Sequence, residues 1–566
     1  MQARTFIDPN RVLLFNERSE GINDLVKAKG EEMKATFTSH RPVVMGTKWM
    51  IASGHPLASQ AGAALLEKGG NAVDAAIAAN AVLCVVRPHM CGIGGDTFVL
   101  LHKSGEKGVR ALNATGRTPY QVSKVFFDKR GLKKFPEKGM LPVTVPGAVD
   151  GWMTLLEKYG TMDRGEVFQR AIEYAEEGFP VYRELSDVIE KESKLLRQCA
   201  ASEKTFFKNG RPPKVGERLV QKEMADSFRK IVEGGREAFY RGDLGKALVK
   251  FSEKNGGLLT ERDLEDHRST WVEPLETTYK GYHIHVMPPN SQGLALLMQA
   301  NILENFDLAK IGHNTLDYVH LFVEAKKLAF ADRDRYVCDP DFRSIPVEKM
   351  DSKAYGKEQA ARINLKKAAV RVPPTNFKST GEDTIYLAVV DRQGNAISFI
   401  NSLYEAFGSG MMIDGTGILL HNRGKDFRLD PTHFNCIEPH KRPYHTLSPS
   451  LIFKGEEPFM VLGSPGADGQ TQTLIQVLAN LIDFGADIQG AVESPRWRSN
   501  PGNHLHIEGR FPAAVIRGLK GRGHKVEVLP EWSSICGGAL GIMIDHEHGT
   551  LLGGGDPRRQ DYVIGR

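Results

Sequence analysis

The chain has 566 residues, with 74 basic and 69 acidic side chains that leave a net charge of +5. Because this charge is near balance and no basic cluster is interleaved with aromatic residues, we expect neither nucleic acid nor an anionic membrane as a partner. No apolar run reaches the roughly 20 residues that a membrane-spanning helix needs, and the N-terminus lacks a signal-peptide layout. The length favours two or three domains, or one large α/β unit.

Six cysteines are scattered along the chain without CxxC spacing. This pattern is typical of reduced thiols, so we expect a cytoplasmic protein. The cysteines are Cys84, Cys91, Cys199, Cys338, Cys436 and Cys536. Residues 1–44 are polar and irregular, which predicts an arm that wraps a partner or the rest of the fold. An arm of this kind is compatible with a homo-oligomer.

The regular pattern begins after residue 45. Hydrophobic periodicity predicts a strand at 49–54, helices at 55–68 and 71–86, and a strand at 97–102. A turn with glycines at positions 92, 94 and 95 precedes the second strand. Glycine permits positive φ and close backbone approach. The turn therefore either simply connects helix to strand or forms a backbone wall beside a site.

The middle of the chain is mainly helical. Periodicity predicts helices at 167–178, 294–305 and 316–336, a mixed-charge helical layer at 182–270 and a strand at 279–287. Residues 352–380 are rich in lysine and then proline, with little to bury, and predict an exposed loop. Such a loop suits self-processing just beyond it, and it suits an ordinary inter-domain linker equally well.

At residue 384 the sequence changes from charged to β-branched and apolar. A charged run ends at Asp383, and Thr384 begins an apolar strand that forms a hairpin with 396–401. The later pattern predicts a strand at 459–462, a glycine-rich turn at 463–469, helices at 470–484 and 513–520, and strands at 526–529 and 539–544. We infer that the backbone is cut before Thr384, which then acts as an N-terminal nucleophile. Most Asp-Thr pairs merely begin a strand, so the flanking sequence has to support this hypothesis.

With these features in place, the chain resembles the γ-glutamyltransferase family of N-terminal nucleophile hydrolases. The resemblance covers most of the chain in ordered blocks. They are Asn71–Ala76, Gly92–Gly95, Val145–Gly147, Gly256–Thr260, Met287–Pro289, Asp391–Asn395, Gly417–Leu420, Leu447–Pro449 and Asp556–Arg558. The resemblance implies an α/β fold with four αββα layers and a proenzyme cut between Asp383 and Thr384. The products would be a large subunit, 1–383, and a co-folded small subunit, 384–566, joined as a heterodimer.

The resemblance also implies catalysis without a cofactor. Once the cut frees the α-amine of Thr384, this amine, with a pKa of about 7.7–8.0, serves as general base for the Thr384 hydroxyl. Ser402 occupies the position of a family threonine that hydrogen-bonds the nucleophile. Gly466 and Ala467 occupy the positions of two glycines whose N–H groups form the oxyanion hole. The same loop is also compatible with an ordinary strand-to-helix turn.

The implied substrate pocket departs from the family pattern. Asp426 occupies the position of the acid that binds the glutamyl α-amine. The arginine that binds the glutamyl α-carboxylate is replaced by Thr115, with Arg117 nearby. Tyr404 replaces an asparagine, and Arg423 replaces a polar neutral residue near Asp426.

The two family serines that also bind this carboxylate are replaced by His445 and Thr446. The pocket thus loses one cation and gains another at Arg423, whose planar guanidinium favours a carboxylate. We therefore expect an amidohydrolase or acyltransferase for a small acidic acyl group, similar to oxamate amidohydrolases and cephalosporin acylases. Alternatively, Arg423 forms a structural salt bridge.

Two other functions stay open. One is true γ-glutamyl transfer or glutathione hydrolysis, with Arg117, Arg423 and Thr446 binding the carboxylate. The other is a non-catalytic binding or scaffold protein. The scaffold hypothesis would explain the lost pocket residues but not the retained nucleophile and glycine loop.

Four histidines in the C-terminal third raise the question of a metal. They are His421, His433, His440 and His445. Their spacing matches no usual zinc pattern and no cysteine pair accompanies them, so we expect no metal site there.

Overall fold

The structure, a computed structural model, describes residues 37–370, 372 and 383–566. Most of the predicted N-terminal arm and the last part of the predicted loop before Thr384 lie outside the described residues. Within the described part, residues 37–566 form one unit, which matches the expectation of one large α/β unit.

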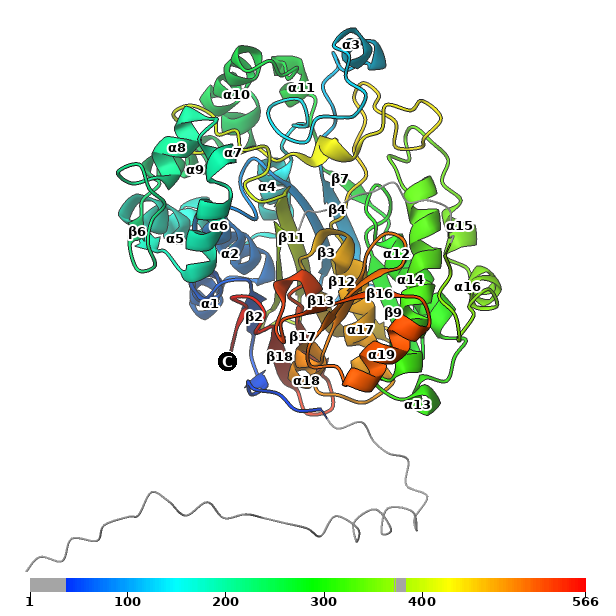
Figure 1. Ribbon diagram of the computed structural model, residues 1–566. Helices are drawn as coiled ribbons and strands as arrows, with labels where there is room; N and C mark the ends of the chain where they lie inside the picture. Colours follow the sequence, from blue (N-terminus) through cyan, green and yellow to red (C-terminus); the bar gives the residue numbers. More distant parts are fainter. Residues whose placement is uncertain (1–36, 371, 373–382) are drawn as a thin grey trace, which may run out of the picture. The chain divides into compact units, whose positions relative to one another are not determined.

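Two seven-stranded antiparallel sheets form the centre of the fold (Figure 1). The first sheet has the order β1 (Val44–Gly46), β18 (Thr550–Gly555), β17 (Leu540–Asp545), β13 (Glu457–Gly463), β12 (Ser450–Lys454), β9 (Tyr282–Val286) and β8 (Leu275–Tyr279). The second has the order β19 (Tyr562–Gly565), β2 (Met50–Ser53), β10 (Asp383–Val390), β11 (Ala396–Tyr404), β3 (Asp96–His102), β4 (Arg110–Ala114) and β7 (Thr270–Val272). Both sheets combine strands from before and after residue 384.

Helices cover the outer face of each sheet, as Figure 1 shows for α1, α2 and α5 on one side and α12 and α14 on the other. The second sheet is covered by α1 (Pro56–Lys68), α2 (Ala72–Val86), α4 (Ala148–Tyr159), α5 (Arg164–Glu177) and α9 (Lys222–Tyr240). The first sheet is covered by α12 (Leu294–Leu303), α14 (Leu316–Tyr336), α17 (Gln470–Ile482) and α18 (Ile488–Glu493). Asn71 caps α2 through a reciprocal capping box, as its sequence predicts.

The alternation of side chains along β10 shows how the layers are built. Ile385, Leu387 and Val389 pack against the helices, whereas Tyr386 and Ala388 pack between the two sheets. A strand buried on both faces is apolar throughout instead of alternating with polar residues. The fold is therefore the predicted α/β arrangement with four αββα layers.

The other elements surround these layers. The helices are α3 (Lys124–Lys129), α6 (Arg183–Lys191), α7 (Ser193–Leu196), α8 (Ala200–Phe206), α10 (Asp243–Lys254), α11 (Glu261–Glu265), α13 (Leu308–Ile311), α15 (Val347–Met350), α16 (Lys353–Ala360) and α19 (Ala513–Gly521). The 3-10 turns are η1 (Arg423–Asp426), η2 (Ala467–Gly469) and η3 (Ser534–Cys536). The short strands are β5 (Phe179–Pro180), β6 (Arg218–Leu219), β14 (Trp497–Ser499), β15 (His504–Glu508) and β16 (Lys525–Leu529).

Two sequence-based predictions of local structure have wrong bounds. The strand predicted at 279–287 is present as β9 (Tyr282–Val286), but Tyr279 ends β8, and Lys280 and Gly281, both with positive φ, turn the chain between the two strands. The loop predicted at 352–380 begins with helix α16, which buries Tyr355 and Ala360.

All six cysteines are buried free thiols. Among the described residues, no helix is long and apolar enough to cross a membrane.

Candidate active site

Thr384 lies near the start of β10 and pairs with Ser402 near the end of β11. The two strands form the predicted hairpin, in register from Ile385–Asn401 onward. Because side chains alternate along a strand, Thr384 and Ser402 share the inter-sheet face with Tyr386. The Oγ atoms of Thr384 and Ser402 are 3.0 Å apart, and both residues are buried.

The backbone around Ser402 fixes its hydroxyl. The Tyr404 N–H donates to Ser402 Oγ at 2.8 Å. On the other side, a Cβ at Gly95 would lie 2.6 Å from the Ser402 carbonyl oxygen, so only glycine fits there. The glycine turn before β3 is thus both a connection and a backbone wall against the strand that carries Ser402. Tyr404 itself has a φ of 83°, an uncommon value for a bulky residue.

Arg423 is a buried cation that forms no ion pair with any residue that the structure describes. It lies in η1, and its guanidinium stacks on the Tyr404 ring at 3.8 Å. Nη1 donates to Thr446 Oγ1 at 2.9 Å, whereas Nε and Nη2 have no partner among the described residues. Burial lowers the pKa of Arg423, although nearby acids partly offset this effect. A buried guanidinium with free N–H groups is a site prepared for an anion.

Asp426 lies three residues further on and is also buried, with its carboxylate beside the hydroxyl of Tyr404. Burial raises the pKa of Asp426, while Lys425, the Tyr404 hydroxyl and Arg423 act to lower it. Arg423, Tyr404 and Asp426 thus form a buried polar group that is connected through the Tyr404 backbone to Ser402.

The glycine loop that is predicted to form the oxyanion hole leads from β13 into η2. Gly466 has a φ of 126° and Ala467 a φ of 46°, so both lie in the left-handed region. Gln292 joins this loop to the segment that supports Arg423. Its Nε2 donates to the carbonyl oxygens of Ala467 at 2.9 Å and of Thr446 at 2.5 Å. Its Oε1 accepts from Arg333 Nη1 at 2.8 Å.

We expect Ala467→Gly to stabilise the protein without slowing catalysis. A left-handed alanine costs about 1–2 kcal/mol, which glycine avoids, although glycine adds entropy to the unfolded chain. The N–H that is predicted to face the oxyanion is unchanged. The expected result is a higher Tm, reflecting a gain of about 0.5–1 kcal/mol, with an unchanged kcat. A large fall in kcat would show that the alanine methyl group itself has a role at the site.

His445 does not occupy a free pocket position but belongs to a buried network with Asp96. His445 Nε2 lies 3.3 Å from Asp96 Oδ2, and the Leu447 N–H donates to His445 Nδ1. Asp96 Oδ1 also accepts from the Gly116 N–H at 3.2 Å. Burial raises the pKa of Asp96 to about 7, although Arg423 and backbone N–H groups act in the opposite direction. Asp96 is thus placed to change charge near neutral pH.

This network predicts a pH-dependent affinity for anionic substrates. Below pH 7 the Asp96 carboxyl is mainly protonated. Above pH 7 it becomes an anion, which weakens the attraction between the Arg423 guanidinium and a substrate carboxylate. The KM of a carboxylate-bearing substrate should therefore rise severalfold between pH 6 and pH 8. The KM of its neutral amide analogue should stay flat, and parallel pH profiles for both substrates would contradict this role of Asp96.

The structure places Thr115 and Arg117 in other networks. Thr115 Oγ1 donates to Asn113 Oδ1 at 2.7 Å. The guanidinium of Arg117 pairs with Asp339 at 2.9 Å and with Asp341 at 2.6 Å. Neither residue contacts the Thr384–Ser402 pair or Arg423 among the described hydrogen bonds and ion pairs. Their predicted role in binding the substrate carboxylate therefore stays a prediction without a structural contact in its favour.

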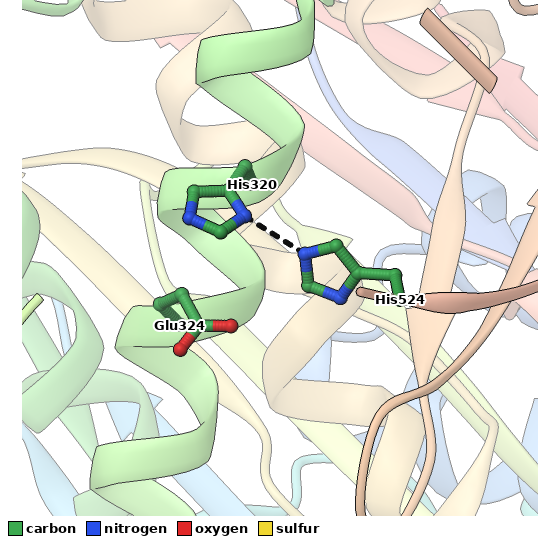
Figure 2. A group of neighbouring side chains, drawn as sticks. All are labelled: His320, Glu324 and His524. Carbon is green, nitrogen blue, oxygen red and sulfur yellow. Dashed lines mark hydrogen bonds between the residues drawn. The ribbon is translucent and has the colours of Figure 1, made fainter. Parts of the chain in front are cut away.

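Three residues outside this site lie close enough to be considered for a metal ion (Figure 2). His320 and Glu324 are one turn apart on α14, and His524 approaches them from the loop before β16. His320 Nδ1 and His524 Nε2 are 2.8 Å apart, while Glu324 accepts from Lys327 Nζ at 2.7 Å. A divalent cation here would face the Lys327 ammonium. We therefore assign these residues a structural role.

The four histidines considered in the sequence analysis as metal ligands are dispersed in the structure. His421 and His445 lie near Asp96, whereas His440 stacks on Tyr120 with a centroid distance of 4.3 Å. None of these four belongs to the His320–Glu324–His524 group.

The sequence analysis did not identify Gln292 and Asp96 as residues of the site. The only local pattern that could have pointed to them is the glycines in the segments where they lie.

Comparison with known proteins links the site to a family. The family model described as Gamma-glutamyltranspeptidase matches residues 58–566. The chain is 42% identical to the glutathione hydrolase-like YwrD proenzyme of Bacillus subtilis (strain 168), over 92% of this chain and 99% of that protein. It is 36% identical to the acylase ACY 1 proenzyme of Pseudomonas sp. (strain SE83), over 92% and 94%. The crystal structure of cephalosporin acylase from Bacillus halodurans superposes with a TM-score of 0.88 and 37% identity, covering 95% of this chain and 99% of that chain.

Proposed function

Since the chain belongs to the gamma-glutamyltranspeptidase family of N-terminal nucleophile hydrolases, we propose that it is an autoprocessing amidohydrolase with Thr384 as nucleophile. Its substrate is an amide whose small acyl group carries a carboxylate. The active form is a heterodimer of residues 1–383 and 384–566. The relatives that are named as proenzymes support the processing step.

Processing begins with attack of the Thr384 hydroxyl on the carbonyl carbon of Asp383. The acyl group moves from the Thr384 nitrogen to its Oγ, so the C–N bond breaks as the ester C–O bond forms. Water then hydrolyses the ester, which leaves a carboxylate on Asp383 and a free amine and hydroxyl on Thr384. A shared sheet holds the two products together, because β2 and β3 of the first subunit flank β10 and β11 of the second.

The same hydroxyl then acts on the substrate amide. The Thr384 amine accepts the proton of the hydroxyl as Oγ attacks the acyl carbon, and it returns the proton to the leaving amine. Ser402 Oγ, 3.0 Å from Thr384 Oγ1, orients the nucleophile. The N–H groups of the Gly466–Ala467 loop stabilise the oxyanion. Water, or an acceptor amine, releases the acyl group by the reverse steps.

The observation that carries the substrate class is the unsatisfied guanidinium of Arg423. Its Nε and Nη2 are buried without a partner in the described structure, and it is connected through Tyr404 and Ser402 to Thr384. An arginine held by Tyr404 and Thr446 is oriented for bidentate binding of a carboxylate. This supports a glutaryl-type or oxamate-type acyl group.

A second candidate is γ-glutamyl transfer or glutathione hydrolysis. The buried carboxylate of Asp426 favours it, because a carboxylate is a suitable partner for an ammonium group. An acyl group with both a carboxylate and an amine would use Arg423 and Asp426 together. The two candidates differ in whether the amine is required.

The test compares three amides under the same conditions: γ-glutamyl, glutaryl and oxamate-type substrates. N-terminal sequencing of the small subunit should first give Thr384. A preference for glutaryl or oxamate amides over γ-glutamyl amides supports the first candidate, and the reverse order supports the second. An intact chain, or hydrolysis only of neutral acyl amides, would refute both.

A further inference from the structure

A cavity of about 150 Å³ is lined by none of the proposed catalytic residues, although Arg117, one of the predicted substrate-binding residues, does line it. Its lining comes from four segments: Arg117 after β4, Val145 before α4, the stretch 263–270 from α11 into β7, and the stretch before β12 that holds His440 and Arg442. Neither Thr384 nor Arg423 lines it. Three arginines do so, namely Arg117, Arg268 and Arg442.

Arg442 is the unusual member of this set. It is 7% exposed, and its guanidinium forms no ion pair within the described part of the protein, although its backbone N–H donates to Asp339 Oδ2 at 2.7 Å. Nε donates to the Thr115 carbonyl at 3.1 Å and Nη2 to Thr270 Oγ1 at the long distance of 3.4 Å. Burial and the nearby Arg117 lower the pKa of Arg442 to about 10, although Asp339, Asp341 and Asp96 act in the opposite direction. A buried cation in this state is costly unless an anion accompanies it.

The acidic residues at the cavity do not supply that anion. Asp263 accepts from the Tyr120 N–H at 2.7 Å and from Thr260 at the cap of α11. Asp266 accepts from the Tyr120 hydroxyl at 3.1 Å. Both carboxylates are therefore already engaged away from Arg442.

A second buried polar group at the cavity lacks a partner. His267 is 5% exposed, and its Nε2 has no hydrogen bond in the described structure. An imidazole nitrogen that carries a proton can donate to an oxyanion bound beside the Arg442 guanidinium. The exposed Arg268 at the rim adds positive charge at the entrance.

We propose that this cavity is a second anion site, which binds a small oxyanion such as a carboxylate or a phosphate through Arg442 and His267. The site is independent of the proposed reaction, because its argument uses none of the catalytic residues. It is connected to the catalytic region through the chain itself, since Arg442 is three residues from His445 and four from Thr446.

The test measures stabilisation of the full-length protein by inorganic phosphate and by acetate, at constant ionic strength with sodium chloride. We expect phosphate, acetate or both to raise the Tm in a saturable manner. Arg442→Met should weaken the apparent affinity at least tenfold. Arg218→Met, at an exposed arginine of β6, should retain it. The stronger of the two ions identifies the ligand class.

A crystal of the unmodified protein soaked in selenate provides a measurement that does not depend on variants. The anomalous peak should lie within hydrogen-bond distance of Arg442. Where Arg442→Met does not fold, Thr270→Phe fills the cavity and should abolish the effect. Stabilisation that is equal in the wild type and in the folded cavity variant, or a selenate peak only at Arg423, would overturn the proposal.

Discussion

Thr384→Ala is expected to leave a single uncut chain without amidohydrolase activity. The substitution removes the hydroxyl that attacks the Asp383 carbonyl, so neither the ester nor the free α-amine forms. Activity should fall to background, because nucleophile and base are lost together. Intact-mass measurement checks the first effect, and hydrolysis of a glutaryl amide checks the second.

Thr384→Ser is the matched control, since it keeps the hydroxyl and removes only the methyl group. It should process more slowly and regain a small subunit that begins at residue 384. A cut chain in the alanine variant would show that another group or a separate protease performs the cleavage. Full activity of an uncut chain would show that the α-amine is not the base.

The hairpin of β10 and β11 was predictable because its signals are local. The apolar run from Thr384 and the glycine turn after Asp391 define two adjacent strands, and the two-residue period places Thr384 and Ser402 on one face. The prediction that these strands belong to a fold of four αββα layers came from the family resemblance. The hairpin at Lys280–Gly281 carried the same kind of turn signal, and the prediction of one strand overlooked it.

The support of the site was not predictable in this way. Gln292 joins Thr446 and Ala467 across more than 150 residues of sequence, and Asp96 meets His445 across 349. Contacts of that separation depend on how the two sheets pack, which no local pattern records. The position of Arg117 shows the reverse problem. It is close in sequence to the missing family arginine, yet its guanidinium is engaged by Asp339.

Arg423→Met should reduce activity and raise stability at the same time. The methionine keeps an apolar stem against the Tyr404 ring but removes the cation. Loss of a buried charged partner costs about 2–5 kcal/mol, so kcat/KM for a carboxylate-bearing amide should fall by two to three orders of magnitude. For the neutral analogue it should change little. The ratio of the two values therefore isolates recognition of the carboxylate from general damage.

The change in stability separates this role from a structural salt bridge. Among the described residues Thr446 is the hydrogen-bond partner of the buried guanidinium, so removing the guanidinium relieves a desolvation penalty that nearby acids offset only in part. We expect the Tm of the unliganded variant to rise, whereas breaking a structural ion pair would lower it. Arg423→Lys keeps the charge without the planar guanidinium, so its kcat/KM should lie between those of the wild type and of Arg423→Met. A lower Tm with an unchanged substrate ratio would assign Arg423 to the architecture and leave the specificity to Asp426.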